Sequence, residues 1–398
     1  MPSKRNPTTA HAEGVSDKGA ISYRRVVVKA GTSLLTGGAD RLDLETMATL
    51  VGQIARLHAL GIEVILVSSG AVAAGRHVLG VAREGKDLPL RQALAAVGQG
   101  HLMHAYEQLF SWHDIPVAQA LLSRRDLVDR LGYLNVRNTL LALLEHRVVP
   151  IINENDVVAV EELTGNVFGD NDTLSAMVAN IVDADLLVML TDTGGLYTAD
   201  PNRDPSATLI SRVESVDDSV MELAEEHRSA STRGGMASKL AAAKQATEAG
   251  VTVVIAPGGE PDVVQPVACG EPLGTLFPTG TTKVESRKRW LLSGMADSGG
   301  VLVADDGAVR AVRAQERSLL PAGVRGVRGA FRRGDVISVE STSGQRIAYG
   351  IANYDADDLR AIQQAKSDQI MDLIGHHYGD EAIHRNNMVV LGRNGADS

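Results

Sequence analysis

Features typical of secreted and membrane proteins are almost missing from this sequence. It has one cysteine, Cys269, in 398 residues, which excludes a disulfide framework and fits the reducing cytosol. No apolar run reaches the length of a transmembrane helix, and the first residues lack the hydrophobic segment of a secretory signal. We therefore expect a cytoplasmic protein that makes no contact with membranes and has a disordered leader at residues 1–22.

Positive charge is also scarce. With 39 Lys and Arg against 49 Asp and Glu, the formal net charge of −10 argues against bulk binding of nucleic acid. Residues 286–398 carry 15 Lys and Arg against 14 Asp and Glu, and residues 1–285 carry 24 against 35, so two domains of different charge are implied. We expect a leader, a catalytic domain, a linker, a small domain and a tail at residues 1–22, 23–278, 279–292, 293–376 and 377–398.

Two glycine-rich signatures of nucleotide binding are absent. No GxxxxGK[ST] loop follows the first predicted strand, which excludes a Walker-type site there. No GxGxxG follows that strand either, and no acidic residue stands about twenty positions later in the expected context. A nucleotide-binding dehydrogenase is therefore disfavoured.

Residues 150–197 hold the densest group of polar side chains. Apolar residues predict buried strands at 148–152 and 186–190 with an amphipathic helix between them, and Asn171 or Asp172 occupies the expected N-cap position of that helix. The cluster is either a solvated loop with a helix cap or a ligand-binding rim at the carboxyl ends of parallel strands. Glycine-rich loops expected on the same rim favour the second interpretation. The polar residues of the cluster are Asn153, Glu154, Asn155, Asp156, Asp170, Asn171 and Asp172.

Strands and helices alternate through the larger domain. The first predicted strand, at 25–29, ends at Lys29, which is either an ordinary strand-end lysine or a point charge for a phosphate. Gly31 is expected to let the backbone turn sharply and approach a ligand. A strand at 62–67 runs into Ser69 and a row of small residues, which either leave backbone N–H groups open to an anion or allow close packing of a helix on the sheet. The alternation predicts an α/β fold with an open, mostly parallel sheet sandwiched by helices.

A third glycine-bearing junction lies further along the chain. Gly234 and Gly235 precede a predicted helix that runs to Glu248, with Lys239 one turn inside it. Such a junction binds phosphate in many proteins and is a plain turn in others. Together, three glycine-bearing loops, two lysines and a carboxylate cluster suggest phosphoryl transfer, which needs positive charge, Mg²⁺ and a well-placed acceptor.

The C-terminal part has a different pattern. Turn residues separate short β segments, which predict a small barrel or sandwich, at 300–304, 308–312, 323–327, 336–340 and 347–354. A group of arginines is either a solvated basic face or an RNA-contacting strip. It consists of Arg325, Arg328, Arg332 and Arg333. The histidines of the tail lack the spacing of a metal site.

The assembled motifs resemble those of the glutamate 5-kinases within the amino acid kinase family, over nearly the whole chain. The matching segments are VVVKAGTSLLT (26–36), VSSGAVAAGR (67–76), AAVGQG (95–100), INEND (152–156), GDNDTLSA (169–176), GGMASK (234–239) and ESRKRW (285–290). The segment LLPAGVRGVRGAFRRGDVI (319–337) resembles the PUA domain that many bacterial members carry. The resemblance implies the amino acid kinase fold followed by a small, β-barrel-like PUA domain.

The resemblance also implies an activity. ATP would phosphorylate the γ-carboxylate of L-glutamate to give L-glutamyl 5-phosphate, the first step of proline biosynthesis, with proline as a feedback inhibitor. ATP would carry Mg²⁺, and the protein itself would have no metal site. A homo-oligomer, either a dimer or a tetramer, and hand-off of the product to glutamyl phosphate reductase are further expectations.

Site residues follow from the resemblance position by position. Lys29 and Lys239 would stabilise the transferring phosphoryl group, Asp172 would orient both lysines, and Asp156 would receive the α-ammonium of glutamate. The residues implied for glutamate binding are Ser69, Asp156 and Asn171. The residues implied for ATP binding are Lys29, Gly31, Thr191, Asp192, Arg233, Gly234, Gly235, Met236, Ala237, Ser238 and Lys239.

Two alternatives stay open at this point. One is another kinase of the same fold that forms an acyl phosphate. The other is a PUA-bearing, RNA-binding regulator without kinase activity. Retention of both lysines and of the GDND motif argues against the regulator.

Overall fold

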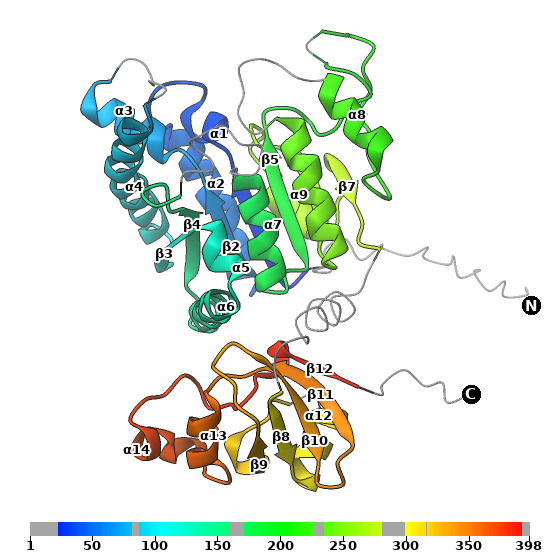
Figure 1. The fold of residues 1–398 in the computed structure, drawn as a ribbon. Helices are drawn as coiled ribbons and strands as arrows, with labels where there is room; N and C mark the ends of the chain where they lie inside the picture. The colour runs from blue at the N-terminus through cyan, green and yellow to red at the C-terminus, as the bar shows by residue number, and fades with distance from the viewer. Residues whose placement is uncertain are drawn as a thin grey trace, which may run out of the picture.

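Two α/β units follow each other along the chain in the computed structural model (Figure 1). The described residues are 23–81, 87–159, 171–201, 203–226, 235–280, 299–315 and 317–391. The larger unit precedes residue 281 and the smaller one begins at residue 299, which agrees with the predicted fold class. Within these ranges, every helix is too short or too polar to span a membrane.

A seven-stranded sheet forms the centre of the larger unit. Its strands are β1 (Arg25–Ala30), β2 (Glu63–Ser68), β3 (Val117–Leu122), β4 (Val149–Glu154), β5 (Leu186–Thr191), β6 (Thr252–Pro257) and β7 (Thr275–Phe277). The strand order is β3-β4-β2-β1-β5-β6-β7, and all neighbours are parallel except the edge pair β6 and β7. The carboxyl ends of the parallel strands therefore share one rim.

Helices cover both faces of this sheet. They are α1 (Thr32–Thr36), α2 (Leu44–Ala59), α3 (Ala71–Leu79), α4 (Leu88–Ser111), α5 (Arg124–Val128), α6 (Arg130–Glu145), α7 (Asn171–Ile181), α8 (Asp218–Glu226), α9 (Met236–Glu248) and α10 (Val264–Ala268). Val26 and Val28 of β1 face a core shared with α2, α4 and α10, whereas Val27 faces a core shared with α6, α7 and α9. Burial on both faces explains why the strands read as continuous apolar runs.

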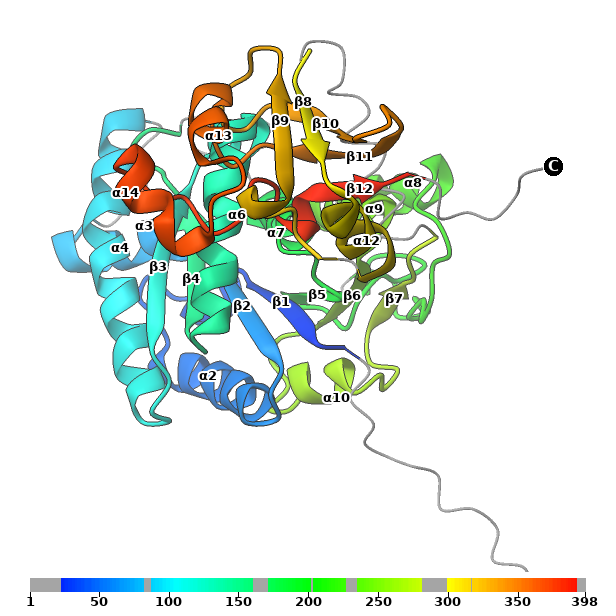
Figure 2. The ribbon, with the colours of Figure 1, turned by 90° about the horizontal axis from the view of Figure 1, so that it is seen from below.

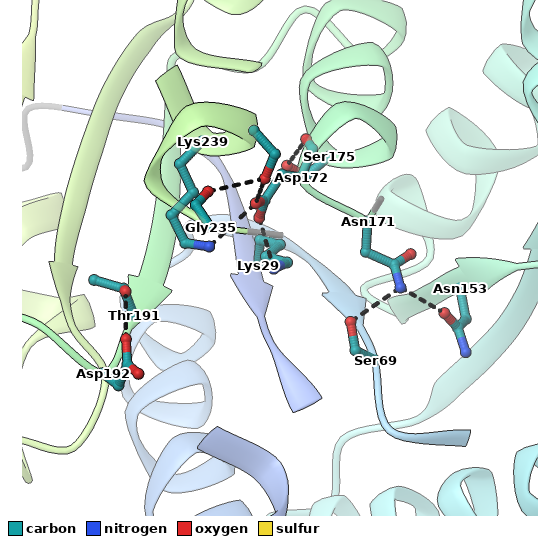
Figure 3. A network of polar contacts seen from close by, with 11 residues as sticks. Lys29, Ser69, Asn153, Asn171, Asp172, Ser175, Thr191, Asp192, Gly235 and Lys239 are labelled. Atoms are coloured by element: carbon teal, nitrogen blue, oxygen red, sulfur yellow. Dashed lines mark hydrogen bonds and ion pairs between the residues drawn. The ribbon is translucent and has the colours of Figure 1, made fainter. Parts of the chain in front are cut away.

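The start of α7 differs from the prediction. This helix begins at Asn171, so neither Asn171 nor Asp172 is its N-cap residue, and that expectation was wrong. Both residues are buried, with relative exposures of 3% and 0%. A capping side chain folds back onto its own helix, whereas these two side chains point into the rim of the sheet (Figure 3).

The smaller unit has a five-stranded sheet with the order β12-β11-β10-β8-β9. Its strands are β8 (Val301–Ala304), β9 (Val324–Arg328), β10 (Val336–Ser341), β11 (Arg346–Ile351) and β12 (Met388–Val390). Its helices are α12 (Asp306–Gln315), α13 (Ala356–Ile362) and α14 (Ile370–Ile374), with 3₁₀ turns η1 (Pro321–Gly323), η2 (Ser367–Gln369) and η3 (Arg385–Asn387). Four of the predicted β segments overlap strands of this sheet.

The predicted strand at 308–312 is wrong, because these residues lie in α12. Asp305 Oδ1 accepts a hydrogen bond from the Ala308 backbone N–H at 2.8 Å, which satisfies a donor at the start of the helix. Val309 and Val312 stand three residues apart, and both pack on the core of the smaller unit. In a short apolar run this spacing is compatible with either a strand or a helix.

The two units meet at α6. Leu134 of α6 has no exposed surface and packs in a small apolar cluster with Val336, Tyr349, Ile351 and Val389 of the smaller unit. Figure 1 shows the smaller unit beneath α6, and Figure 2, seen from below, shows its strands in front of α6 and α7. The helix that contacts the smaller unit therefore also leads directly into β4 of the larger sheet.

Candidate active site

The carboxyl ends of neighbouring strands bring most of the predicted site residues together. In the register of the sheet, Lys29 of β1 lies between Val67 of β2 and Met189 of β5. Val67 in turn lies beside Ile152 of β4. Residues at or just after these positions therefore share one edge, and they include Ser69, Asn153, Glu154 and Thr191.

Two lysines from distant parts of the chain meet one carboxylate at this edge (Figure 3). Lys29 Nζ lies 2.6 Å from Asp172 Oδ1, and Lys239 Nζ lies 3.1 Å from Asp172 Oδ2. Ser238 Oγ also donates to Asp172 Oδ2 at 2.6 Å. The side chains of Lys29, Asp172 and Lys239 are at most 9% exposed. Strand β1 and helices α7 and α9 therefore each contribute one member of a buried ion cluster.

The charge balance of this cluster is positive. Burial by itself would raise the pKa of Asp172, but the charges of Lys29 and Lys239 outweigh burial and hold that pKa well below its usual range. Among these three side chains, two ammonium groups against one ionised carboxylate give an excess of positive charge. In a buried site, where screening by water is weak, this excess attracts an anion strongly.

Gly31 does not make the sharp turn that the sequence analysis expected. Its φ of −83° and ψ of 163° are extended backbone that any residue adopts, so this part of the prediction was wrong. A Cβ at Gly31 would stand 3.4 Å from Lys29 Nζ. Glycine therefore leaves open space beside the lysine ammonium. Gly70, just before α3, does have left-handed backbone, with φ of 100°.

A chain of buried amides lies on the other side of Lys29. Asn171 Nδ2 donates to Ser69 Oγ at 2.9 Å and to Asn153 Oδ1 at 3.1 Å (Figure 3). Asn153 Nδ2 donates in turn to Gln99 Oε1 of α4 at 2.8 Å. This row of amides therefore leaves Asn171 Oδ1 as a buried acceptor for which the described residues supply no hydrogen-bond donor.

Asp156 lies two residues beyond β4 and is buried, at 9% exposure. Burial, and after it the negative charge of Glu154, raises the pKa of Asp156 to about 7, although the positive charge of Arg91 acts in the opposite direction. A cation placed beside Asp156 favours the ionised form of its carboxylate. The pair Glu154 and Asp156 is therefore suited to receive a positively charged group.

The remaining predicted residues lie around β5 and the start of α9. Thr191 Oγ1 donates to Asp192 Oδ1 at 3.1 Å, and Gly235 stands at the N-terminal end of α9. Met236 and Ala237 pack partly against the core. Asp170, Arg233 and Gly234 lie outside the described residues. No group of three or more His, Cys, Asp or Glu side chains in the described ranges is arranged to hold a metal ion.

Comparisons with known proteins agree with this architecture. The model of the amino acid kinase family matches residues 24–257, more than half of the chain. The glutamate 5-kinase of Dehalococcoides mccartyi is 50% identical over 369 residues, which are 93% of this chain and 99% of that protein. The glutamate 5-kinase of Herpetosiphon aurantiacus gives the same identity and coverage. This chain belongs to the glutamate 5-kinases of the amino acid kinase family.

Further comparisons concern the smaller unit, a third relative and a solved structure. The PUA domain model matches residues 300–374, which lie in the smaller unit. The glutamate 5-kinase of Serratia marcescens is 46% identical over 365 residues, 92% of this chain and 98% of that protein. Among solved structures, a UMP kinase from Bacillus anthracis aligns with 65% of this chain and 97% of its own, at 17% identity and a TM-score of 0.44. That alignment is too loose to add to the family assignment.

Two buried polar residues of the kinase were not among the predicted site residues. Arg91 and Gln99 belong to α4 and have exposures of 5% and 9%. The charge of Arg91 acts on Asp156, and Gln99 accepts a hydrogen bond from Asn153. The available signal was the segment AAVGQG, in which Gln99 interrupts an otherwise small and apolar run. Pattern alone did not indicate the strand end that this glutamine faces.

The arginine strip of the PUA domain is partly engaged within the domain. Arg328 pairs with Glu340, and Arg325 Nη1 donates to Gln364 Oε1 at 3.0 Å. The guanidinium carbon of Arg333 lies 4.2 Å from the centre of the Tyr378 ring. Contact of this strip with RNA remains a prediction.

Proposed function

We propose that this kinase transfers the γ-phosphoryl group of ATP to the γ-carboxylate of L-glutamate and forms L-glutamyl 5-phosphate, the first step of proline biosynthesis. The observation that carries the proposal is the buried cluster of Lys29, Asp172 and Lys239 at the rim of the sheet. Glutamate 5-kinases match 93% of this chain at 50% sequence identity, which supports L-glutamate as the substrate. An excess of positive charge beside a row of amides is what a phosphoryl donor and a charged acceptor require.

The proposed reaction is a direct displacement. An oxygen of the glutamate γ-carboxylate attacks the γ-phosphorus of ATP, the bond from phosphorus to the bridging oxygen breaks, and ADP leaves. The attacking carboxylate is already ionised near neutral pH, so no general base is needed. Lys29 and Lys239 would stabilise the charge that spreads over the phosphoryl oxygens, and Asp172 would hold both ammonium groups in place.

Glutamate would bind at the part of the rim that carries Ser69, Asp156 and Asn171. The carboxylate of Asp156 and the open oxygen of Asn171 are suited to the α-ammonium group. Ser69, which follows β2, would contact the same substrate. The positive charge of Lys29 would attract the reacting γ-carboxylate and hold it at the centre of the rim.

ATP would lie on the other side of Lys29. Its site would comprise Gly31, Thr191, Asp192 and the segment Arg233–Lys239. We assign Mg²⁺ to the nucleotide, because kinase Mg²⁺ is held largely by substrate phosphates and water. The ion would neutralise charge on the phosphates, and the residues of this chain would position the acceptor and the two lysines.

Further properties are part of the same proposal. Proline would act as a feedback inhibitor that uses part of the glutamate pocket, since its α-carboxylate and charged amine have a similar geometry. The kinase would act in the cytoplasm as a dimer or tetramer and pass its product to glutamyl phosphate reductase. The catalytic domain would span residues 23–278, and the linker, PUA domain and tail would follow at 279–292, 293–376 and 377–398.

Trapping of the acyl phosphate tests the function. The purified protein is given ATP, Mg²⁺ and L-glutamate with hydroxylamine, which converts an acyl phosphate to a hydroxamate. We expect equal amounts of ADP and hydroxamate, both dependent on L-glutamate, and much less of either with L-aspartate. A folded protein that releases no ADP in response to glutamate would overturn the proposal, and RNA binding without turnover would favour the regulator instead.

A further inference from the structure

One face of α4 carries three buried polar side chains. Arg91, Gln99 and Tyr106 are eight and seven residues apart, so they lie along the same side of the helix. The positive charge of Arg91 acts on Asp156, Gln99 accepts from Asn153, and Tyr106 Oη lies 2.9 Å from Ser68 Oγ. Each of these side chains therefore supports a segment at the end of β2 or β4.

The amide chain that begins at Gln99 has a defined direction. The backbone N–H of Glu154 can only donate, and it donates to Asn153 Oδ1 at 2.9 Å. Asn153 Oδ1 is therefore the acceptor end of that amide, and Nδ2 must point to an acceptor, which is Gln99 Oε1 at 2.8 Å. The same assignment makes Asn171 the donor to Asn153.

This direction decides what Asn171 offers to a substrate. Its Nδ2 already donates to both Ser69 and Asn153, so its Oδ1 is the atom left for a ligand. A carbonyl oxygen at that point accepts from an ammonium group, whereas an amide nitrogen there would repel one. Orientation of the Asn171 amide therefore selects for an amine on the acceptor.

Removal of the Gln99 oxygen would leave Asn153 Nδ2 as a buried donor without its acceptor. Such a group is costly in a dry site and turns toward other acceptors. The Glu154 N–H would then have to hold the Asn153 amide without help from Gln99, so Asn153 would hold Asn171 less firmly in its present orientation. Gln99 itself lies behind Asn153 on α4, so it acts on the pocket through Asn153 and Asn171.

We propose that Gln99 is a positioning residue that, together with the Glu154 backbone N–H, holds the amide orientation of Asn153 and Asn171 and thereby supports the selectivity of the kinase for an acceptor with an α-ammonium group. The inference rests on the proposed function, since it assumes that glutamate is the acceptor.

Kinetics of Gln99→Met test the inference, because methionine keeps the length of the side chain and removes its acceptor oxygen. We expect the KM for L-glutamate to rise about tenfold, the scale of a displaced hydrogen bond to a charged group. The KM for ATP and kcat should stay within about threefold. Gln99→Glu keeps an oxygen opposite Asn153 Nδ2 in either protonation state, so it should restore most of the affinity for glutamate.

Gln108→Met is the matched control, since Gln108 is exposed on the same helix, and its constants should equal those of the wild type. An unchanged glutamate KM in Gln99→Met would overturn the proposal. An equal rise of the glutamate KM in Gln99→Met and Gln99→Glu would also overturn it. So would a fall in kcat together with a rise in the ATP KM, because both outcomes indicate general damage to the fold. A wild-type enzyme without glutamate-dependent turnover would instead contradict the proposed function.

Discussion

Asp172 contacts two lysines and has no exposed surface, so the three side chains cannot be treated as separate surface charges. Burial and the two ammonium groups act on its pKa in opposite directions, and the ammonium groups prevail. Asp172 therefore stays ionised through the neutral range, and the positions of Lys29 and Lys239 depend on it. Replacement of one lysine both removes a charge and releases part of the carboxylate from its partners.

The first prediction concerns the two lysines. Lys29→Ala and Lys239→Ala should each lower kcat by roughly 10²–10³, the effect of losing one oriented charge donor in a site of this kind. The KM for glutamate should change far less, because the proposed role of the lysines is to stabilise the transition state. Lys244→Ala, an exposed lysine of the same helix α9, serves as the control and should leave kcat unchanged. A kcat within about threefold of the wild type for either active-site variant would refute the assignment.

The second prediction concerns pH. The pKa of Asp156 is raised to about 7, first by burial and then by the charge of Glu154. The carboxylate is mostly neutral at pH 6 and mostly ionised at pH 8, so the KM for glutamate should fall by up to about tenfold across that interval. Asp156→Asn should raise this KM and remove its pH dependence.

Arg91 provides an independent check of the same electrostatics. Its positive charge lowers the pKa of Asp156, so Arg91→Met should raise that pKa further and move the KM profile to higher pH. The measurement is the glutamate KM at several pH values for the wild type, Arg91→Met and Asp156→Asn. A profile of Arg91→Met that coincides with the wild type would show that Arg91 does not act on Asp156.

At the scale of elements, α3 and α4 approach each other very closely. A Cβ at Gly98 of α4 would stand 1.8 Å from the Ala71 carbonyl oxygen, and one at Gly75 of α3 would stand 1.9 Å from the Leu94 carbonyl oxygen. Only glycine permits this distance, and the close contact places the polar face of α4 next to the strand ends. The packing of the two helices therefore affects the proposed glutamate pocket.

The third prediction compares two glycines of α4. Gly98→Ala should destabilise the fold by about 1–3 kcal/mol, because the new methyl group meets backbone that cannot yield easily. Gly100→Ala should stabilise it by about 0.4–1 kcal/mol, since nothing lies within 4 Å of a Cβ there and alanine favours the helix. Denaturant unfolding measures both free energies. Equal stability of the two variants would contradict the described helix contact.

Most strands could be predicted from the sequence because their chemistry is local. Val26–Val28 and Leu186–Leu190 are apolar and buried on both faces, so composition alone marks them. By contrast, β7 has three residues and carries too short a pattern to detect, and Val309 with Val312 fits either a strand or a helix. Local patterns thus recover long elements and lose the short ones.

The site residues, too, could be predicted only in part from the sequence. The resemblance located Lys29, Asp172 and Lys239 by motif, and in the structure each lysine ammonium lies within 3.1 Å of an Asp172 oxygen. The contact of Gln99 with Asn153 joins residues 54 positions apart, and no local pattern states which strand end a helix will face. Gly31 was misjudged because a glycine in the sequence does not reveal whether its φ or its missing side chain matters.

At the scale of the whole molecule, the fourth prediction concerns the contact between the two units. A chain ended near Lys283 should fold and retain glutamate-dependent turnover, because every residue assigned to the reaction lies between Lys29 and Lys239. It should also expose Leu134, which the PUA domain covers in the full chain. The truncated protein is therefore expected to self-associate more readily.

The substitution Leu134→Gln distinguishes the two forms. In the full chain the substitution should lower the free energy of unfolding by roughly 1–3 kcal/mol, since a polar amide enters an apolar contact. In the truncated chain the same substitution should change the free energy of unfolding by less than about 0.5 kcal/mol, and it should improve solubility. Unfolding and sedimentation measurements on all four proteins test this. A truncated protein that is folded but inactive would show that the PUA domain helps to form the catalytic site.

The distance along the chain between the members of the ion cluster also affects the protein while it is being synthesised. Asp172 leaves the ribosome 67 residues before Lys239, the partner of its second oxygen. At about 5–20 residues per second, roughly 3–13 s pass before Lys239 can pair with the carboxylate. Lys239 belongs to α9, and β6 follows only after that helix. A nascent chain therefore cannot assemble the cluster early, and it gains the ability to turn over ATP only when the larger sheet is nearly complete.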